Sequence, residues 1–152
     1  MIQIKGVPAA VAMVSGGEGN RLIRGTVRFF QRRGGVLVEA DISGLPISGF
    51  FGFHIHEGSS CSGLQFSDTK AHYDPTNMAH PMHSGDLPPL LSAGGRAYMA
   101  VLTDRFSIGQ IIGKTVVVHS RADDFQSQPA GNAGEKIACG VIQPVLRSST
   151  RM

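Results

Sequence analysis

The stretch RGTVRFFQRRGGVLVEADIS, residues 24–43, decides the fold class. Its second half alternates between two sets of side chains, the apolar Val36, Val38, Ala40 and Ile42 and the mainly polar Leu37, Glu39, Asp41 and Ser43. A period of two is typical of a strand with one face in the core and the other largely in water. Residues 24–31 supply a partner strand, and the glycines of residues 32–35 allow a tight turn. The stretch therefore predicts an antiparallel hairpin.

The rest of the chain continues this pattern. Twenty Gly and eight Pro punctuate short β-type segments, and no segment has apolar residues at the helical period over three turns. Further strands are expected around residues 7–14, 49–56, 96–103, 114–120 and 139–146. Two segments, 57–92 and 121–136, are longer than ordinary structureless loops, which indicates functional loops. We predict one all-β domain over residues 1–146 and a polar tail over residues 147–152.

Composition excludes several partners. The net charge is +3, but the 14 Lys and Arg are scattered, which argues against nucleic acid and leaves a small anion as the better fit. No apolar run approaches the roughly 18 residues that a membrane span needs. The apolar residues 7–14 behind Lys5 lack a cleavage site, so no export signal is visible. We expect a cytoplasmic protein, or an exported one if a leader has been removed.

All six histidines have metal-ligand spacing. They fall into three groups, His54 and His56 in a predicted strand, His72, His80 and His83 with Asp86 in a loop, and His119 after a β-branched run. Residues i and i+2 of a strand point to one face, so the first pair can converge on an ion. Imidazole suits copper and zinc, whereas thiolate-rich sites need more than two cysteines. The pattern indicates a site of nitrogen and oxygen donors.

Each group taken alone has a simpler interpretation. The strand pair could be polar residues on an exposed sheet, the loop residues could be solvated, and His119 could be a core or edge histidine. Together, six His and one Asp complete a four-ligand copper site and a four-ligand zinc site only if one imidazole serves both ions. The two nitrogens of the ring allow this.

Four sequence blocks identify a relationship. They are GFHIHE (52–57), HPMHSGDL (80–87), VVVHSRADD (116–124) and GNAGEKIACGVI (131–142). With these blocks in this order, the chain resembles a Cu,Zn superoxide dismutase over nearly its whole length. The resemblance implies an eight-stranded Greek-key β-barrel or sandwich with two long functional loops. It also implies copper and zinc as cofactors.

The resemblance assigns the ligands as well. It implies that copper is bound by His54, His56, His72 and His119, and that zinc is bound by His72, His80, His83 and Asp86. His72 is then the bridge and carries the proton that catalysis transfers. Asp123 matches a carboxylate that orients one histidine of each site, here His54 and His80.

The two cysteines leave an alternative open. Free thiols are the default in a cytosolic protein. The resemblance implies instead a disulfide between Cys61 and Cys139, which would tie the long loop to the last strand.

The chain also departs from the family pattern. Lys136 occupies the position of an arginine that usually guides superoxide to copper, so the positive charge remains without the planar fork. Its alternative is an exposed residue without a role. Segment 123–130 is shorter than the charged loop of many relatives, and His80 and His83 are closely spaced.

The leading hypothesis is an enzyme that disproportionates superoxide to oxygen and hydrogen peroxide. Its expected partner is the superoxide anion, and a homodimer is a further option. The alternative is a copper-binding or copper-delivery domain of the same fold with little turnover. A copper-only variant is weaker, because it should lack the zinc residues.

Overall fold

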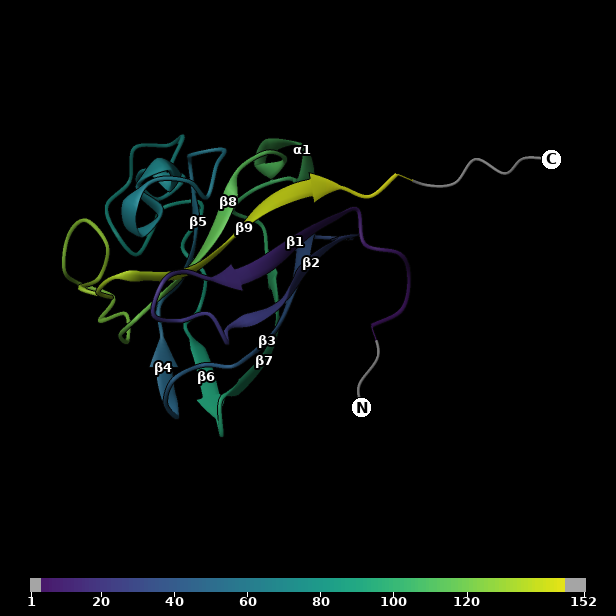
Figure 1. The fold of residues 1–152 in the computed structure, drawn as a ribbon. Coiled ribbons are helices and arrows are strands. Elements are labelled where there is room, and N and C mark those ends of the chain that lie inside the picture. The colour runs from purple at the N-terminus through teal and green to yellow at the C-terminus, as the bar shows by residue number, and fades with distance from the viewer. Residues whose placement is uncertain (1–3, 147–152) are drawn as a thin grey trace.

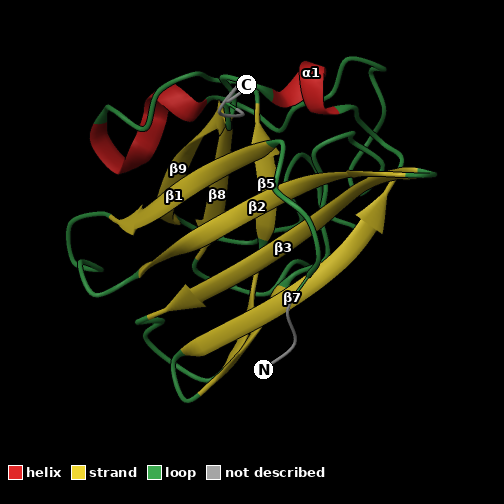
Figure 2. Cartoon of the chain, turned by 90° about the vertical axis from the view of Figure 1, so that its right-hand side faces the viewer, coloured by secondary structure: helices red, strands yellow, loops and turns green. Residues whose placement is uncertain are grey.

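Within residues 4–146, nine strands form one antiparallel sheet that curls into a barrel (Figures 1 and 2). This computed structural model describes residues 4–146, so the polar tail expected over residues 147–152 lies outside the described residues. The strands are β1 (Ala10–Gly16), β2 (Arg24–Arg32), β3 (Gly35–Ser43), β4 (Gly49–Phe51), β5 (Phe53–His56), β6 (Leu90–Ala93), β7 (Arg96–Thr103), β8 (Thr115–His119) and β9 (Lys136–Pro144). Two short helical turns, η1 (Leu64–Thr69) and α1 (Ile108–Ile111), lie between strands.

The predicted hairpin is β2 and β3. Their register runs from Arg24 opposite Ser43 to Arg32 opposite Gly35. The apolar set of β3 is buried as expected. Glu39, expected in water, is only 4% exposed, because Arg28 pairs with its carboxylate and the Tyr98 hydroxyl donates a 2.7 Å hydrogen bond to it.

The number of strands differs from the expected eight because the segment 49–56 is broken at Gly52. The sheet order is β4-β6-β7-β3-β2-β1-β9-β8-β5, so β4 and β5 lie at opposite edges although one residue separates them. Counted as one interrupted strand, they close the barrel and restore the expected eight-stranded Greek-key order. The all-β prediction is confirmed. Strand β6 lies mostly in the segment 57–92, which was expected to be irregular. Its four residues, LLSA, give no clear alternation, so the sequence did not reveal this strand.

The sheet places its two long loops together. β5 pairs with β8 along one edge, while its other edge receives residues from the long loop through isolated bridges, His56 with His72 and His54 with Asp86. The loop with η1 and the loop that follows β8 lie at the same side of the barrel, at the left of Figure 1. Within residues 4–146, no helix has the length and apolar character to cross a membrane.

Candidate metal centre

Four histidines converge at the edge of the barrel. His54 and His56 come from β5, His119 ends β8, and His72 joins them from the long loop. Each offers a ring nitrogen within 4.8 Å of the others. The Nε2 atoms of His56 and His119 are 3.1 Å apart, and the rings of His54 and His72 stack with centroids 4.0 Å apart. All four are buried, so the pair predicted to share a strand face does converge.

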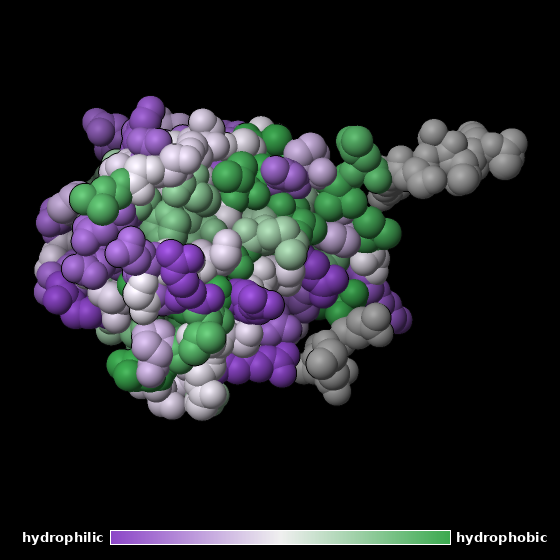
Figure 3. All heavy atoms as spheres, viewed as in Figure 1, coloured by the Kyte–Doolittle hydropathy of each residue, from purple (hydrophilic) through white to green (hydrophobic). Residues whose placement is uncertain are grey.

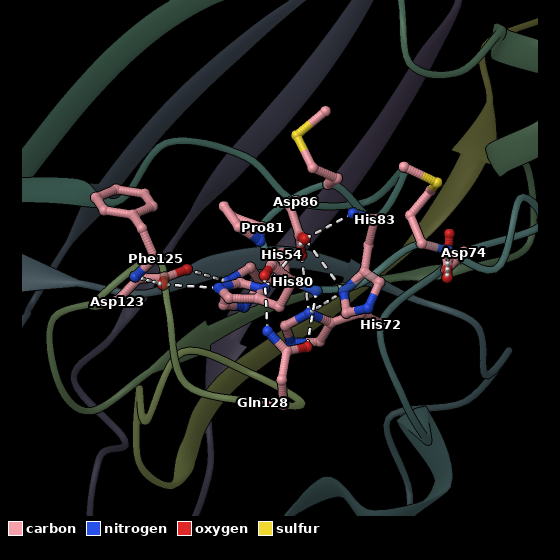
Figure 4. A network of polar contacts seen from close by, with 12 residues as sticks. His54, His72, Asp74, His80, Pro81, His83, Asp86, Asp123, Phe125 and Gln128 are labelled. Carbon is pink, nitrogen blue, oxygen red and sulfur yellow. Dashed lines mark hydrogen bonds and ion pairs between the residues drawn. The ribbon is translucent and has the colours of Figure 1, made fainter.

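A second group of donors gathers in the loop around Asp86 (Figure 4). The carboxylate oxygens of Asp86 lie 2.8 Å from His72 Nδ1, 3.1 Å from His80 Nδ1 and 3.1 Å from His83 Nδ1. His72 Nδ1 and His83 Nδ1 are 3.2 Å apart. Ligands of a tetrahedral zinc ion with bonds of about 2.0 Å lie about 3.3 Å from one another. The spacing of these four donors fits such an ion.

Proximity alone does not separate the two groups. The donors of His54, His72, His80 and Asp86 also lie within 4.8 Å of one another. Contact with Asp86 separates them, because its carboxylate lies within 3.1 Å of a ring nitrogen of His80 and of His83, whereas the carboxylate that His54 contacts is Asp123. We therefore place His83 in the loop group and His54 in the strand group.

Three buried ring nitrogens have no hydrogen-bond partner among the described residues. They are His54 Nδ1, His72 Nε2 and His80 Nδ1, the last of which lies 3.1 Å from Asp86 but outside hydrogen-bond geometry. Buried polar atoms without a partner are rare, and each is costly unless a ligand satisfies it. His72 Nδ1 belongs to the loop group while His72 Nε2 is the unpaired atom, so the ring has one nitrogen available for each group. Copper and zinc fit this donor set of imidazoles and one carboxylate.

Asp123 connects the two groups from behind. Its two oxygens accept hydrogen bonds of 2.8 Å from His54 Nε2 and His80 Nε2. Burial raises the pKa of Asp123, but these hydrogen bonds and one from the Phe125 N–H outweigh burial, and the pKa is lowered. The ionised carboxylate keeps the proton of each ring on Nε2 and leaves each Nδ1 free to bind an ion.

Gly131 makes this approach of Asp123 possible. A Cβ atom at Gly131 would lie 2.0 Å from Asp123 Oδ1 and 2.6 Å from His80 Nε2. The residue also has φ +70, which favours glycine. The sequence block GNAG thus provides the space in which the carboxylate meets His80.

The histidines are poised to bind cations. Burial is the main reason that the pKa of His72 is lowered to about 4 and that of His119 to about 3, and it also lowers the pKa of His56 well below its usual range. Neutral rings at neutral pH carry the free lone pairs that metal binding requires.

Lys136 lies beside the strand group but is tied to the loop. It is opposite His119 in the β8–β9 register. Its ammonium donates hydrogen bonds to Thr69 Oγ1 at 2.7 Å and to the Lys70 carbonyl at 3.0 Å. Burial lowers its pKa. The steering role expected for Lys136 stays a prediction.

The disulfide implied by the resemblance is present. Cys61 and Cys139 are bonded across 78 residues, with Cα atoms 5.9 Å apart. The bond joins the loop that carries His72 to β9.

Two other side chains that hold the loop, Gln128 and Arg105, were missed in the sequence. Gln128 contacts the backbone of His80, and Arg105 contacts the carbonyl of Pro81. Backbone partners leave no signal in residue types, so no sequence pattern could have identified these contacts.

Comparisons with known proteins agree with this geometry. Residues 23–142 match the family described as copper/zinc superoxide dismutase (SODC). "Superoxide dismutase [Cu-Zn] 2" of Aquifex aeolicus is 34% identical, covering 78% of each chain. The Legionella pneumophila "Superoxide dismutase [Cu-Zn]" is 35% identical over 78% of this chain and 77% of that protein. A crystal structure of a double mutant of a SOD-like protein from Bacillus subtilis superposes with a TM-score of 0.73 and 28% identity, covering 86% of this chain and 94% of that one. The chain therefore belongs to the copper/zinc superoxide dismutase family.

Proposed function

We propose that this protein disproportionates superoxide to oxygen and hydrogen peroxide. In this proposal His54, His56, His72 and His119 hold copper, while His72, His80, His83 and Asp86 hold zinc. The observation that carries it is the position of His72, whose Nδ1 lies 2.8 Å from Asp86 while its buried Nε2 has no partner among the described residues. Family membership supports the same assignment.

The two ions would have different tasks. Copper supplies one-electron chemistry because it has two accessible oxidation states, which zinc lacks. The chain supplies the rest. Its strands hold three histidines at fixed positions, and Asp123 fixes the tautomer of His54 and His80.

His72 is the residue that can move a proton. Its Nδ1 is held among the loop donors, so its Nε2 can take up and release a proton without the ring leaving its place. Burial of the ring lowers its pKa to about 4, so without a bound ion the ring is neutral at neutral pH and both of its nitrogens can serve the two groups. Peroxide formation consumes protons, and a donor at this position can deliver one.

Lys136 would act on the approach of superoxide, before any electron or proton is transferred. A positive charge beside the histidine cluster raises the local concentration of a small anion. The hydrogen bonds to Thr69 and Lys70 hold the ammonium near the loop that carries His72. This arrangement supports attraction of superoxide rather than tight docking of it.

Metal analysis paired with a direct superoxide assay tests the proposal. Purified protein loaded with both metals should hold one copper and one zinc per chain and should accelerate superoxide decay far above the rate with free copper. A copper-loaded protein without turnover above that background would favour the copper-binding alternative. Copper binding without zinc would contradict the assignment of the loop donors.

The predicted homodimer has a surface to support it. Phe50 on β4 lies opposite Leu91 on β6, and both are more than half exposed, as is Ile47 just before β4. Hydrophobic residues lie among paler ones at the lower left of Figure 3, where Figure 1 places β4 and β6. We propose that a second copy covers this row. Light scattering should give twice the chain mass for the wild type and the single mass for Phe50→Asp; a wild-type monomer at micromolar concentration would contradict the proposal.

A further inference from the structure

The turn His80–His83 carries two loop ligands and has no sheet ladder of its own. His80 and His83 are buried, while their neighbour Met82 is exposed. The turn therefore needs contacts from outside the loop to keep both rings facing Asp86. Two exposed side chains from different segments supply such contacts.

Gln128 holds the turn from the loop that follows β8. Its Nε2 donates a 2.8 Å hydrogen bond to the His80 carbonyl, and its Oε1 accepts a 2.9 Å hydrogen bond from the His80 N–H (Figure 4). One amide thus satisfies both backbone groups of a single residue. Together with Asp123 on the ring, this loop fixes the backbone and the side chain of His80.

Arg105 holds the turn from the connection between β7 and α1. Its Nη1 donates a 2.7 Å hydrogen bond to the Pro81 carbonyl. The same nitrogen lies 3.4 Å from the His83 carbonyl and 3.5 Å from the Asp86 carbonyl, which are longer and weaker contacts. A single cation therefore faces three carbonyl groups of the loop that the ligands occupy.

We propose that Gln128 and Arg105 are positioning residues that keep the His80–His83 turn in its zinc-binding shape before the ion binds. Neither side chain is among the donors of the site. The proposal rests on the zinc assignment made above. Ordering a loop costs conformational entropy, and a loop that is already ordered binds with less of that cost. Because both side chains are exposed, replacing them leaves the core intact.

The experiment compares Gln128→Ala, Arg105→Ala and the double variant with two controls. Gln126→Ala lies in the same loop, and its side chain makes no hydrogen bond within the described residues. Arg33→Ala removes the same charge as Arg105→Ala from the β2–β3 turn. Protein loaded with copper and zinc is mixed with a chelator, and zinc release is followed over time. Each single variant loses at least one hydrogen bond to the turn, which predicts at least about fivefold faster release, and the double variant should be faster still.

The visible absorption spectrum of cobalt(II) bound in place of zinc reports the geometry of the ligands. A general loss of stability would not change this spectrum. If the turn shifts, the visible absorption bands of the ion should shift in Gln128→Ala and Arg105→Ala and stay unchanged in both controls. Arg105→Lys, which keeps a donor, should recover part of the zinc retention. Unchanged release and unchanged bands would overturn the proposal, as would a lower melting temperature without either effect. A wild type that fails to bind zinc would overturn the zinc assignment instead.

Discussion

The strand-held histidines and the loop-held ligands reach the same site by different means. His54, His56 and His119 are carried by paired strands, where the ladder between β5 and β8 fixes their spacing. His80, His83 and Asp86 lie in a loop whose shape depends on side chains from other segments, namely Asp123, Gln128 and Arg105. The strand half is built by backbone pairing and the loop half by tertiary contacts. A substitution or a change of conditions that weakens tertiary contacts should therefore displace the loop ligands before the strand ligands.

The largest effect should follow from removing the residue that the two halves share. His72→Ala should weaken both metals, by more than the roughly 100-fold that loss of a residue supporting a ligand costs. His83→Ala should release zinc and leave copper bound. Metal analysis after dialysis, with the copper absorption spectrum, checks the contrast. Full copper occupancy with an unchanged spectrum in His72→Ala would disprove the bridge.

Loss of the disulfide should affect the loop half more than the strand half. Replacing Cys61 and Cys139 by serine removes a link across 78 residues, which should lower the free energy of unfolding by about 4 kcal/mol. Urea denaturation of the metal-free protein measures this change. Zinc should be lost at a lower chelator concentration than copper. Equal sensitivity of the two metals would contradict the division into two halves.

Acid should destabilise the metal-free protein through the shared residue His72 and through His119 of the strand half. The folded pKa of His72 is about 4 and that of His119 is about 3, both below the unfolded value of roughly 6.5. As the pH falls below 6.5, the unfolded chain takes up protons that the folded chain refuses, so metal-free stability present above this pH is lost. His72 alone accounts for on the order of 3 kcal/mol by pH 4.

Urea unfolding of the metal-free protein from pH 8 to pH 4 tests this. Each of His72→Asn and His119→Asn should flatten the curve between pH 6 and 4. Near pH 4 the curve should be flatter in His119→Asn, because the folded pKa of His119 is the lower of the two and its contribution is still changing there. A stability that stays constant over this range would show that the buried rings do not control it.

The space that Gly131 leaves for Asp123 predicts a smaller effect, on the metal affinity of both halves. Gly131→Ala should push Asp123 away from His80, and loss of such a supporting contact costs about 10–100-fold in metal affinity. Competition with a chelator measures the affinities. Gly109→Ala is the control, since a Cβ there meets no atom within 4 Å. Equal affinities in the two variants would show that Asp123 tolerates displacement.

The smallest effect should come from Lys136, whose side chain makes no hydrogen bond to either group of ligands within the described residues. Lys136→Glu should slow superoxide decay by roughly tenfold at low salt, and Lys136→Arg should maintain or raise the rate. Added salt should slow the wild type, because screening acts over about 8 Å at physiological ionic strength. Pulse radiolysis at matched copper occupancy measures this, with Arg33→Glu as the charge control. Equal rates for lysine and glutamate would leave Lys136 without a steering role.

The sequence reveals the two halves unequally. Alternation in residues 36–43 and the spacing of His54 and His56 predicted the strands and the convergence of the first pair. The types and spacing of the loop residues also indicated a metal site, whereas the choice of His72 as the bridge and the pairing of Cys61 with Cys139 depended on resemblance to the family. The contacts of Gln128 and Arg105 were beyond reach because their partners are backbone atoms 48 and 24 residues away. The interruption at Gly52 likewise leaves no pattern in the side chains.

The bridges between β5 and the long loop have a consequence for solubility. β5 is an edge strand, and an uncovered strand edge is a template for pairing with another molecule. Here the Ile55 N–H donates to the Gly85 carbonyl, and the Ile55 carbonyl accepts from the Tyr73 N–H, so the loop covers that edge. Gly85 and Tyr73, the chain neighbours of the loop ligands Asp86 and His72, thus cover the edge of β5 and oppose pairing with another molecule. An ordered loop therefore protects the edge of β5 as well as the metal centre.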